Sequence, residues 1–155
     1  MVRISALGLD VGQKRVGVAG CDGLGLISTG LTTIYRTSWQ KDLEELKKIV
    51  DQRQAQILVV GLPYSMDGNI GFQARQVMKF ARRISTALDL PVEYVDERLT
   101  SVEAEEQLKR SKRFSTRDKG AIDRQAAAII LQQWLDQRRS QKLTSPSPIT
   151  EEEIN

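Results

Sequence analysis

Three mainly apolar runs open the chain, and short segments that contain glycine separate them. The runs cover residues 3–10, 15–21 and 26–34, with Gly12 in the first break and Gly23 and Gly25 in the second. Apolar runs of this length that are bounded by turn residues predict β-strands joined by tight turns. We therefore expect the chain to begin with three strands that pair as an antiparallel meander.

After these runs the pattern changes to an alternation of helices and strands. Apolar residues recur at helical spacing in two segments, and a short apolar run follows each of them. Thr100 and Glu103 have the spacing of a capping box, which predicts the start of a further helix. The expected elements are helices at 39–50 and 71–88, strands at 57–60 and 92–95, and helices at 101–109 and from about 118 to about 138.

This order of elements predicts an α/β fold with a mixed five-stranded sheet flanked by helices. The first three strands are antiparallel, and right-handed crossovers make the last two parallel to the first strand. A chain of 155 residues is long enough for one domain with a core. We place this domain at residues 1–139. The polar segment 140–155 contains two prolines and three consecutive glutamates, so it is predicted to be a disordered tail.

The composition excludes several kinds of chemistry. The chain has no histidine, so Ser-His-Asp catalysis and zinc sites with histidine ligands are excluded. A single cysteine, Cys21, allows neither a disulfide within the chain nor a zinc site of cysteines, which fits a reducing cytosol. The formal net charge of +3 weakly favours anionic partners. With no long apolar segment, we expect a soluble cytoplasmic protein without a membrane partner.

Two acidic residues are expected at one edge of the sheet. Asp10 ends the first strand and Glu97 follows the strand at 92–95. The carboxyl ends of parallel strands meet at the edge where open α/β sheets bind ligands. Asp10 could instead be an ordinary turn residue that hydrogen-bonds its own backbone. Asp96 competes with Glu97, because adjacent strand residues point to opposite faces.

A third acid belongs to the last helix. Asp123 shares a helical stripe with Ala127, Ile130 and Trp134, so it is expected to face inward. An acid in the first turn is also favourable to the helix dipole, which is the structural alternative. Three acids that converge would need cations between them. Ligand sets made only of oxygen select Mg²⁺ or Mn²⁺.

Basic residues are concentrated between Glu97 and Asp123. Such a run is usually a solvated surface, but beside a carboxylate site it favours contact with a phosphate backbone. The segment 64–68 contains Asp67-Gly68, which is typical of a turn and could also contact substrate. The basic run comprises Lys109, Arg110, Lys112, Arg113, Arg117 and Lys119.

Four segments of the chain resemble the YqgF/RuvX family of RNase H-like nucleases, relatives of the RuvC Holliday junction resolvases. The resemblance extends to about residue 136. Together the four segments, in this order, are strongly specific to the family. They are Gly8-Leu9-Asp10-Val11-Gly12-Gln13-Lys14-Arg15-Val16-Gly17; Val60-Gly61-Leu62-Pro63 with Met66-Asp67-Gly68; Asp96-Glu97-Arg98-Leu99-Thr100; and Ile122-Asp123 with Ala126-Ala127.

The resemblance implies an RNase H-like fold and a phosphodiesterase site that uses divalent metal ions. Asp10, Glu97 and Asp123 would be the catalytic metal ligands, and hydrolysis would use two Mg²⁺ or Mn²⁺ ions roughly 3.5–4 Å apart. Some RNase H-like relatives place a histidine near the metals, and this chain has none. The residues expected to contact the phosphates of the substrate are Lys14, Arg15, Arg98, Lys112, Arg113 and Arg117.

The family is associated with processing of the 5′ end of the precursor of 16S rRNA. The resemblance therefore implies a hydrolase that cuts structured RNA, with ribosomal precursor particles as partners. One alternative is resolvase-like cleavage of branched DNA, and another is a non-catalytic nucleic-acid-binding factor. The hairpin at Asp10 also resembles the phosphate loop of the actin and sugar-kinase ATPases, but those proteins need two such domains. Both a monomer and a homodimer are compatible with the sequence.

Overall fold

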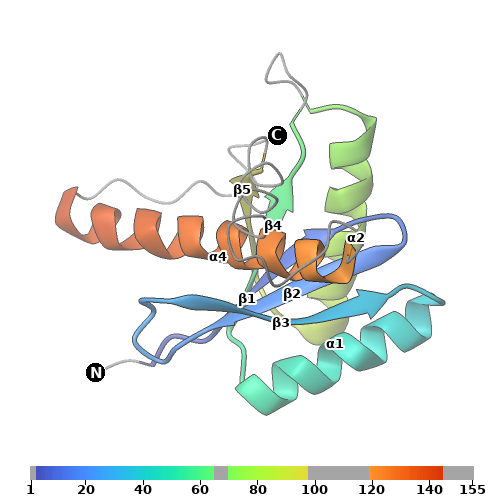
Figure 1. Cartoon of the computed structure of the whole chain (residues 1–155), viewed down its shortest axis with the longest axis horizontal. Helices are drawn as coiled ribbons and strands as arrows, with labels where there is room; N and C mark the ends of the chain where they lie inside the picture. Colours follow the sequence, from blue (N-terminus) through green and yellow to red (C-terminus); the bar gives the residue numbers. More distant parts are fainter. Residues whose placement is uncertain (1–2, 65–69, 98–118, 145–155) are drawn as a thin grey trace.

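A mixed five-stranded sheet forms the centre of the computed structural model, which describes residues 3–64, 70–97 and 119–144. The strand order is β3-β2-β1-β4-β5 (Figure 1). β1, β2 and β3 are antiparallel neighbours, whereas β4 and β5 run parallel to β1. The predicted fold class is therefore confirmed. The strands are β1 (Ala6–Val11), β2 (Arg15–Cys21), β3 (Ser28–Tyr35), β4 (Ile57–Leu62) and β5 (Val92–Asp96).

Helices cover both faces of the sheet. The described helices are α1 (Trp39–Arg53), α2 (Phe72–Leu88) and α4 (Lys119–Thr144). α4 crosses one face, while α1 and α2 lie on the other (Figure 1). The helix predicted at residues 101–109 lies outside the described residues.

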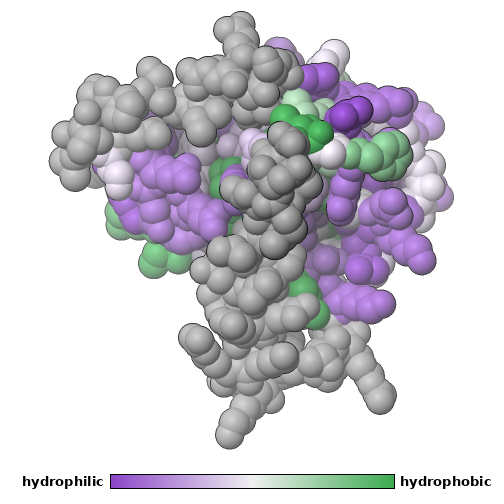
Figure 2. All heavy atoms as spheres, turned by 90° about the horizontal axis from the view of Figure 1, so that it is seen from above, coloured by the Kyte–Doolittle hydropathy of each residue, from purple (hydrophilic) through white to green (hydrophobic). Residues whose placement is uncertain are grey.

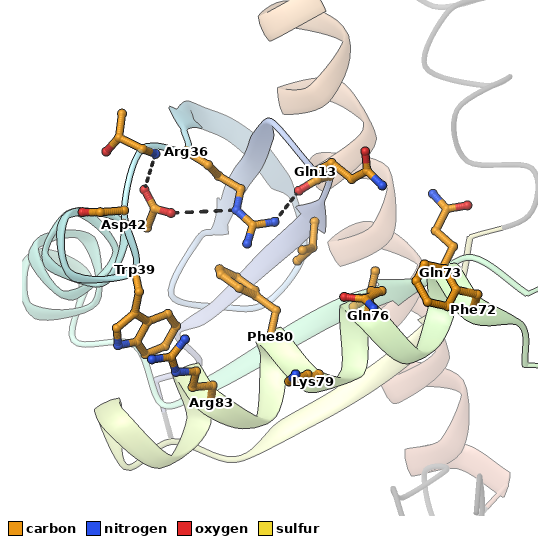
Figure 3. A pocket seen from close by; sticks show the side chains of 15 residues that line it. Gln13, Arg36, Trp39, Asp42, Phe72, Gln73, Gln76, Lys79, Phe80 and Arg83 are labelled. Carbon is orange, nitrogen blue, oxygen red and sulfur yellow. Dashed lines mark hydrogen bonds and ion pairs between the residues drawn. The ribbon is translucent and has the colours of Figure 1, made fainter.

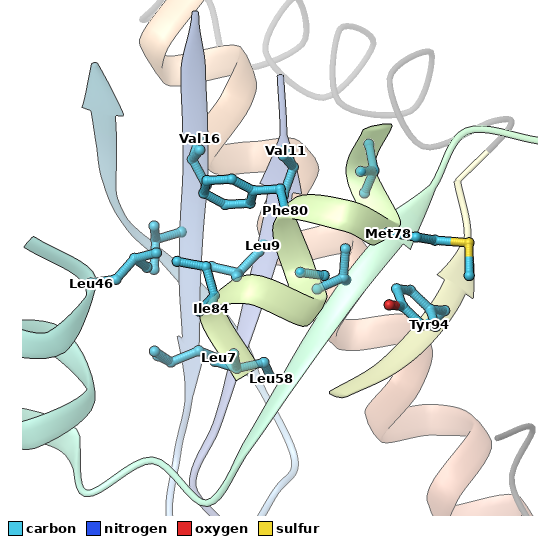
Figure 4. Close-up of a cluster of buried hydrophobic side chains, with 14 of the residues drawn as sticks. Leu7, Leu9, Val11, Val16, Leu46, Leu58, Met78, Phe80, Ile84 and Tyr94 are labelled. Carbon is cyan, nitrogen blue, oxygen red and sulfur yellow. The ribbon is translucent and has the colours of Figure 1, made fainter. Parts of the chain in front are cut away.

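The larger core fills the space between the sheet and the α1/α2 layer. β1 alternates, so that Leu7 and Leu9 point into this core and are completely buried. Ile84 of α2 and Leu46 of α1 pack against them (Figure 4). The intervening residues of β1 consequently face α4, and Asp10 is one of them.

Glycines in the strands allow α4 to lie almost on the sheet backbone. A Cβ atom added to Gly8 would lie 2.7 Å from the Cβ atom of Leu131. A Cβ atom at Gly17 would lie 2.0 Å from the backbone oxygen of Asp123. Glycine inside a strand commonly marks such a close approach. The glycines thus bring the helix that carries Asp123 directly over the end of β1.

Several element boundaries differ from the sequence prediction. β4 does not stop at Val60, because Gly61 pairs with Val95 and Leu62 with Asp96. The strand ends before Pro63, which has no backbone N–H to donate to a sheet. β3 begins only at Ser28, since the side chain of Asp22 accepts hydrogen bonds from three backbone N–H groups of the preceding turn.

The end of α4 is a further correction. The predicted disordered tail was to begin at Ser140, but the helix continues to Thr144. Residues 140–144 include neither proline nor glycine, so nothing in them breaks a helix. The first proline of the tail is Pro146, and a proline disfavours helical geometry in the residue before it. The remainder of the tail lies outside the described residues.

The surface of the described regions is mainly polar on the face shown in Figure 2, where hydrophilic side chains surround a few hydrophobic ones. Among the helices in the described ranges, none combines the length and apolar character needed to span a membrane.

Candidate active site

Asp10 lies inside the sheet, before the turn that joins β1 to β2. It pairs with Gly17 of β2. The turn itself is closed by Gly12, whose N–H donates to the backbone oxygen of Arg15 at 2.8 Å. A Cβ atom at Gly12 would lie 2.9 Å from that same oxygen, which gives glycine a local reason to be there. The side chain of Asp10 forms a hydrogen bond with Glu97. This contact distinguishes Asp10 from an ordinary turn residue.

Glu97 reaches the α4 face from the end of β5. Its backbone N–H donates to the oxygen of Leu62 at 3.1 Å, which continues the pairing of β5 with β4. Its Oε2 atom occupies the space above Gly61, where an added Cβ would lie only 2.5 Å away. Asp96, the competing acid, is exposed. The structure therefore brings Glu97 to Asp10.

Burial perturbs both carboxyl groups of this pair. The loss of solvation raises the pKa of Asp10 to about 6, and the negative charge of Asp123 adds to the effect. Burial raises the pKa of Glu97 to about 8, and the neighbouring charge of Asp10 raises it further. The two carboxyl groups thus share one proton near neutral pH, and this proton lies in the hydrogen bond between them. The pair holds one proton at a place where a cation would also be stabilised.

Asp123 stands close to the pair but has its own partner. Its Oδ2 atom lies 2.6 Å from Nε of Arg15, in an ion pair that joins α4 to the start of β2. Its charge nevertheless raises the pKa of Asp10, so the two carboxylates are neighbours. Asp123 lies beyond the first turn of α4, where the helix dipole does not account for an acid.

The donor set fits a hard divalent cation in its chemistry. Asp10 and Glu97 supply carboxylate oxygens, which Mg²⁺ and Mn²⁺ prefer over sulfur or nitrogen. A cation between them would replace the shared proton and remove the repulsion between the two charges. In the described ranges no three acids are grouped closely enough to hold a metal ion, and Asp123 is instead paired with Arg15.

Of the six basic residues predicted to contact substrate, two belong to the described part of the chain. Lys14 is exposed in the turn after Asp10, while Arg15 is half-buried against Asp123. Arg98, Lys112, Arg113 and Arg117 lie outside the described residues, as does most of the segment 64–68.

Sequence reasoning missed two residues that support the site. Gly61 provides the space for Glu97, and Gly17 provides the space for the backbone of Asp123. Both residues could have been identified from the sequence, because a glycine within an apolar strand pattern commonly marks a close approach of another element.

A sequence model of the family RuvX, described as "Holliday junction resolvase", matches residues 4–137. The chain belongs to the RuvX family. Membership supports a nuclease function, which is the function class that the resemblance implied.

Curated relatives of this RuvX protein are similar over nearly the whole chain. A protein of Rippkaea orientalis named "Putative pre-16S rRNA nuclease" is 78% identical over 139 residues, which cover 90% of this chain and 100% of that relative. A protein of Synechocystis with the same name is 65% identical, and the match covers 89% of this chain and 91% of that relative.

Solved structures with the same fold include two complexes with Holliday junction substrates. Thermus thermophilus RuvC in complex with a Holliday junction has a TM-score of 0.58 and 13% identity. The match covers 94% of this chain and 100% of RuvC. The fowlpox virus resolvase with its junction DNA has a TM-score of 0.55 and 8% identity, and covers 87% of this chain and 99% of the resolvase. At these identities the likeness shows the fold alone, which is that of the RuvC-like, RNase H-type resolvases.

From the raised pKa values of Asp10 and Glu97, we expect this RuvX protein to lose stability as pH rises. The pKa values of Asp10 and Glu97 are raised above their ordinary values near 4, so the folded protein binds more protons than the unfolded chain between about pH 4 and pH 8. The free energy of unfolding should therefore fall over this window, by about 1 kcal/mol or more without divalent metal. Urea unfolding in EDTA at the two ends of the window measures the change.

The variant Glu97→Gln is the control, because an amide does not titrate and the larger of the two raised pKa values is lost with it. The difference in stability between wild type and variant should depend on pH in the same window. A difference that is constant from pH 4 to pH 8 would show that Glu97 is not buried against Asp10.

Proposed function

We propose that this RuvX protein is a metal-dependent endonuclease that processes the 5′ end of pre-16S rRNA. The observation that carries the proposal is the buried pair of Asp10 and Glu97 on the sheet edge, with the carboxylate of Asp123 beside it. Carboxylates that are buried together without a charged partner between them mark a site built for cations. The names of the curated relatives support pre-16S rRNA as the substrate.

Asp10, Glu97 and Asp123 are proposed to hold Mg²⁺ or Mn²⁺, for which the resolvase-like members of the fold give precedent. Bound divalent ions would activate a water molecule and stabilise the oxygen that leaves the phosphorus atom. Asp10 and Glu97 lose their shared proton when they act as ligands. Arg15 fixes the position of Asp123 and supplies positive charge near the substrate phosphate. Lys14, which is exposed in the turn before Arg15, is proposed to contact the neighbouring phosphate.

The proposed partner is structured RNA within a ribosomal precursor particle in the cytoplasm. Single-turnover cleavage of an RNA that carries the 5′ extension of pre-16S rRNA tests this assignment. We expect cleavage with Mg²⁺ or Mn²⁺, none with EDTA, and no cleavage of the matching mature 5′ end. A protein that binds the RNA but leaves it intact under every metal condition would be a non-catalytic binding factor.

Branched DNA is the second candidate substrate. It is favoured by the family description and by the fold, which this chain shares with RuvC. A four-way DNA junction in the same single-turnover assay separates the candidates. Cleavage of the junction at least as fast as cleavage of the RNA would make this protein a resolvase instead.

A further inference from the structure

A groove of about 950 Å³ lies on the α1/α2 side of the sheet, away from α4. It is formed where the β1–β2 turn, the start of α1 and the first half of α2 meet (Figure 3). The turn contributes Val11, Gly12 and Gln13, which follow Asp10 directly in the chain. The groove therefore adjoins the turn that follows Asp10, on the opposite face of the sheet from the Asp10 side chain, and extends from this turn along α2.

Positive charge exceeds negative charge in this groove. Arg36, Lys79 and Arg83 line it, and Asp42 is the acidic side chain among its lining residues. Arg36 donates to the backbone oxygen of Gly12 at 2.7 Å and lies 3.8 Å from the carboxylate of Asp42. It thereby fixes the active-site turn to the start of α1. Lys79 and Arg83 are exposed, and α2 contains four basic residues and no acidic residue.

Aromatic side chains lie among these cations. The guanidinium of Arg83 lies 3.9 Å from the centre of the Trp39 ring, and that of Arg36 lies 4.5 Å from the centre of the Phe80 ring. These stacks hold the planar guanidinium groups in place, where their edges can donate to phosphate oxygens. Phe72, at the start of α2, also lines the groove, but no cation covers its ring in the described structure. It is 73% exposed. A large exposed aromatic ring of this kind is a suitable surface for a base to stack on.

We propose that this groove binds the single-stranded segment of nucleic acid that adjoins the cleavage position. Fixed cations for phosphates together with an exposed ring for bases are the features of single-strand binding, whereas the bases of a duplex are already stacked. The amide side chains of Gln73 and Gln76 can donate to and accept from base edges in the same groove. The proposal rests on the proposed nuclease function, since it assigns the path of that substrate.

Binding of a labelled single-stranded RNA of about 15 nucleotides, measured in EDTA so that it stays intact, tests the groove. The double variant Lys79→Gln/Arg83→Gln removes two exposed cations. The slope of log affinity against log salt concentration should become shallower by about 1.4, or about 0.7 for each lost phosphate contact. Phe72→Ala should weaken binding by about 5-fold or more without changing the slope. Both variants should melt within roughly 4 °C of the wild type, because the altered side chains are exposed and the exposed contact of Arg83 with Trp39 contributes at most about 1 kcal/mol.

The matched control is Lys47→Gln/Lys48→Gln, which removes two exposed cations of α1 that do not line the groove. For this control variant, the slope of log affinity against log salt concentration should stay close to that of the wild type. Equal effects of the two double variants, or no effect of Phe72→Ala, would overturn the groove assignment. The outcome is separable from the proposed function: if the wild type cleaves and the groove variants bind normally, only the groove fails. If the groove variants lose binding and no substrate is cleaved, the nuclease function fails and the groove stands.

Discussion

Replacing Asp10 by Asn or Glu97 by Gln should lower the rate of metal-dependent cleavage by about 1,000-fold or more. The two carboxyl groups are in contact and are the central donors of the proposed metal site. Metal ions contribute several kcal/mol to such reactions, and each 1.4 kcal/mol corresponds to a factor of ten in rate. An amide has nearly the shape of a carboxyl group, so the loss should come from charge rather than from packing. Single-turnover cleavage at saturating protein measures the chemical step.

Glu93→Gln provides a matched control on the same face of β5. Its Oε2 atom accepts a hydrogen bond from Nε1 of Trp134 at 3.1 Å, away from Asp10. The same change of carboxyl to amide there should leave cleavage within about twofold of wild type. Near-normal, metal-dependent cleavage by Asp10→Asn or Glu97→Gln would end the assignment of these residues.

Gly17→Ala should cause the largest loss of stability among single-methyl substitutions at the site, about 3 kcal/mol or more. The added Cβ would lie 2.0 Å from the backbone oxygen of Asp123, so α4 must move off the sheet. The melting temperature should fall by roughly 6–12 °C. Because α4 carries Asp123, cleavage should fall in the same variant at temperatures where it is still folded.

Gly71→Ala is the control for this prediction, since no atom lies within 4 Å of a Cβ atom at Gly71. Its effect on the free energy of unfolding should stay within about 1 kcal/mol. Equal stability of Gly17→Ala and Gly71→Ala would show that α4 does not rest on β2.

The positions of the three acids could be predicted from the sequence, because they depend on the type and order of the helices and strands. Asp10 and Glu97 lie at the carboxyl ends of β1 and β5, whose parallel direction follows from the helical crossovers. Asp123 lies on the stripe of α4 that buries Ala127 and Ile130. These are properties of element type and order, and hydrophobic spacing determines both.

The contacts that organise the site could not be predicted in the same way. The ion pair of Arg15 with Asp123 joins residues 108 positions apart, and it depends on how far α4 lies along β2. The position of Glu97 above Gly61 depends on the register of β5 and on two further residues of β4 that the sequence interpretation left outside the strand. Sequence patterns specify which face a residue occupies, whereas distances between faces are set by the packing of side chains.

The groove beside α2 was not predicted from sequence for a related reason. The turn with Gln13, the start of α1 with Trp39 and the exposed face of α2 are unremarkable when each is taken alone. The four basic residues of α2 can be read from the sequence, but their proximity to the turn that follows Asp10 exists only in the folded protein.

Anomalous scattering of Mn²⁺ in crystals of the wild-type protein tests directly whether Asp10 and Glu97 hold the metal ion. We expect a peak within coordination distance of carboxylate oxygens of both Asp10 and Glu97, with Asp123 beside it. The same soak of Glu97→Gln crystals should give a weaker peak or none. If Mn²⁺ supports cleavage in solution but the crystals show Asp10 and Glu97 still hydrogen-bonded to each other, with manganese bound elsewhere, the site has been assigned to the wrong residues.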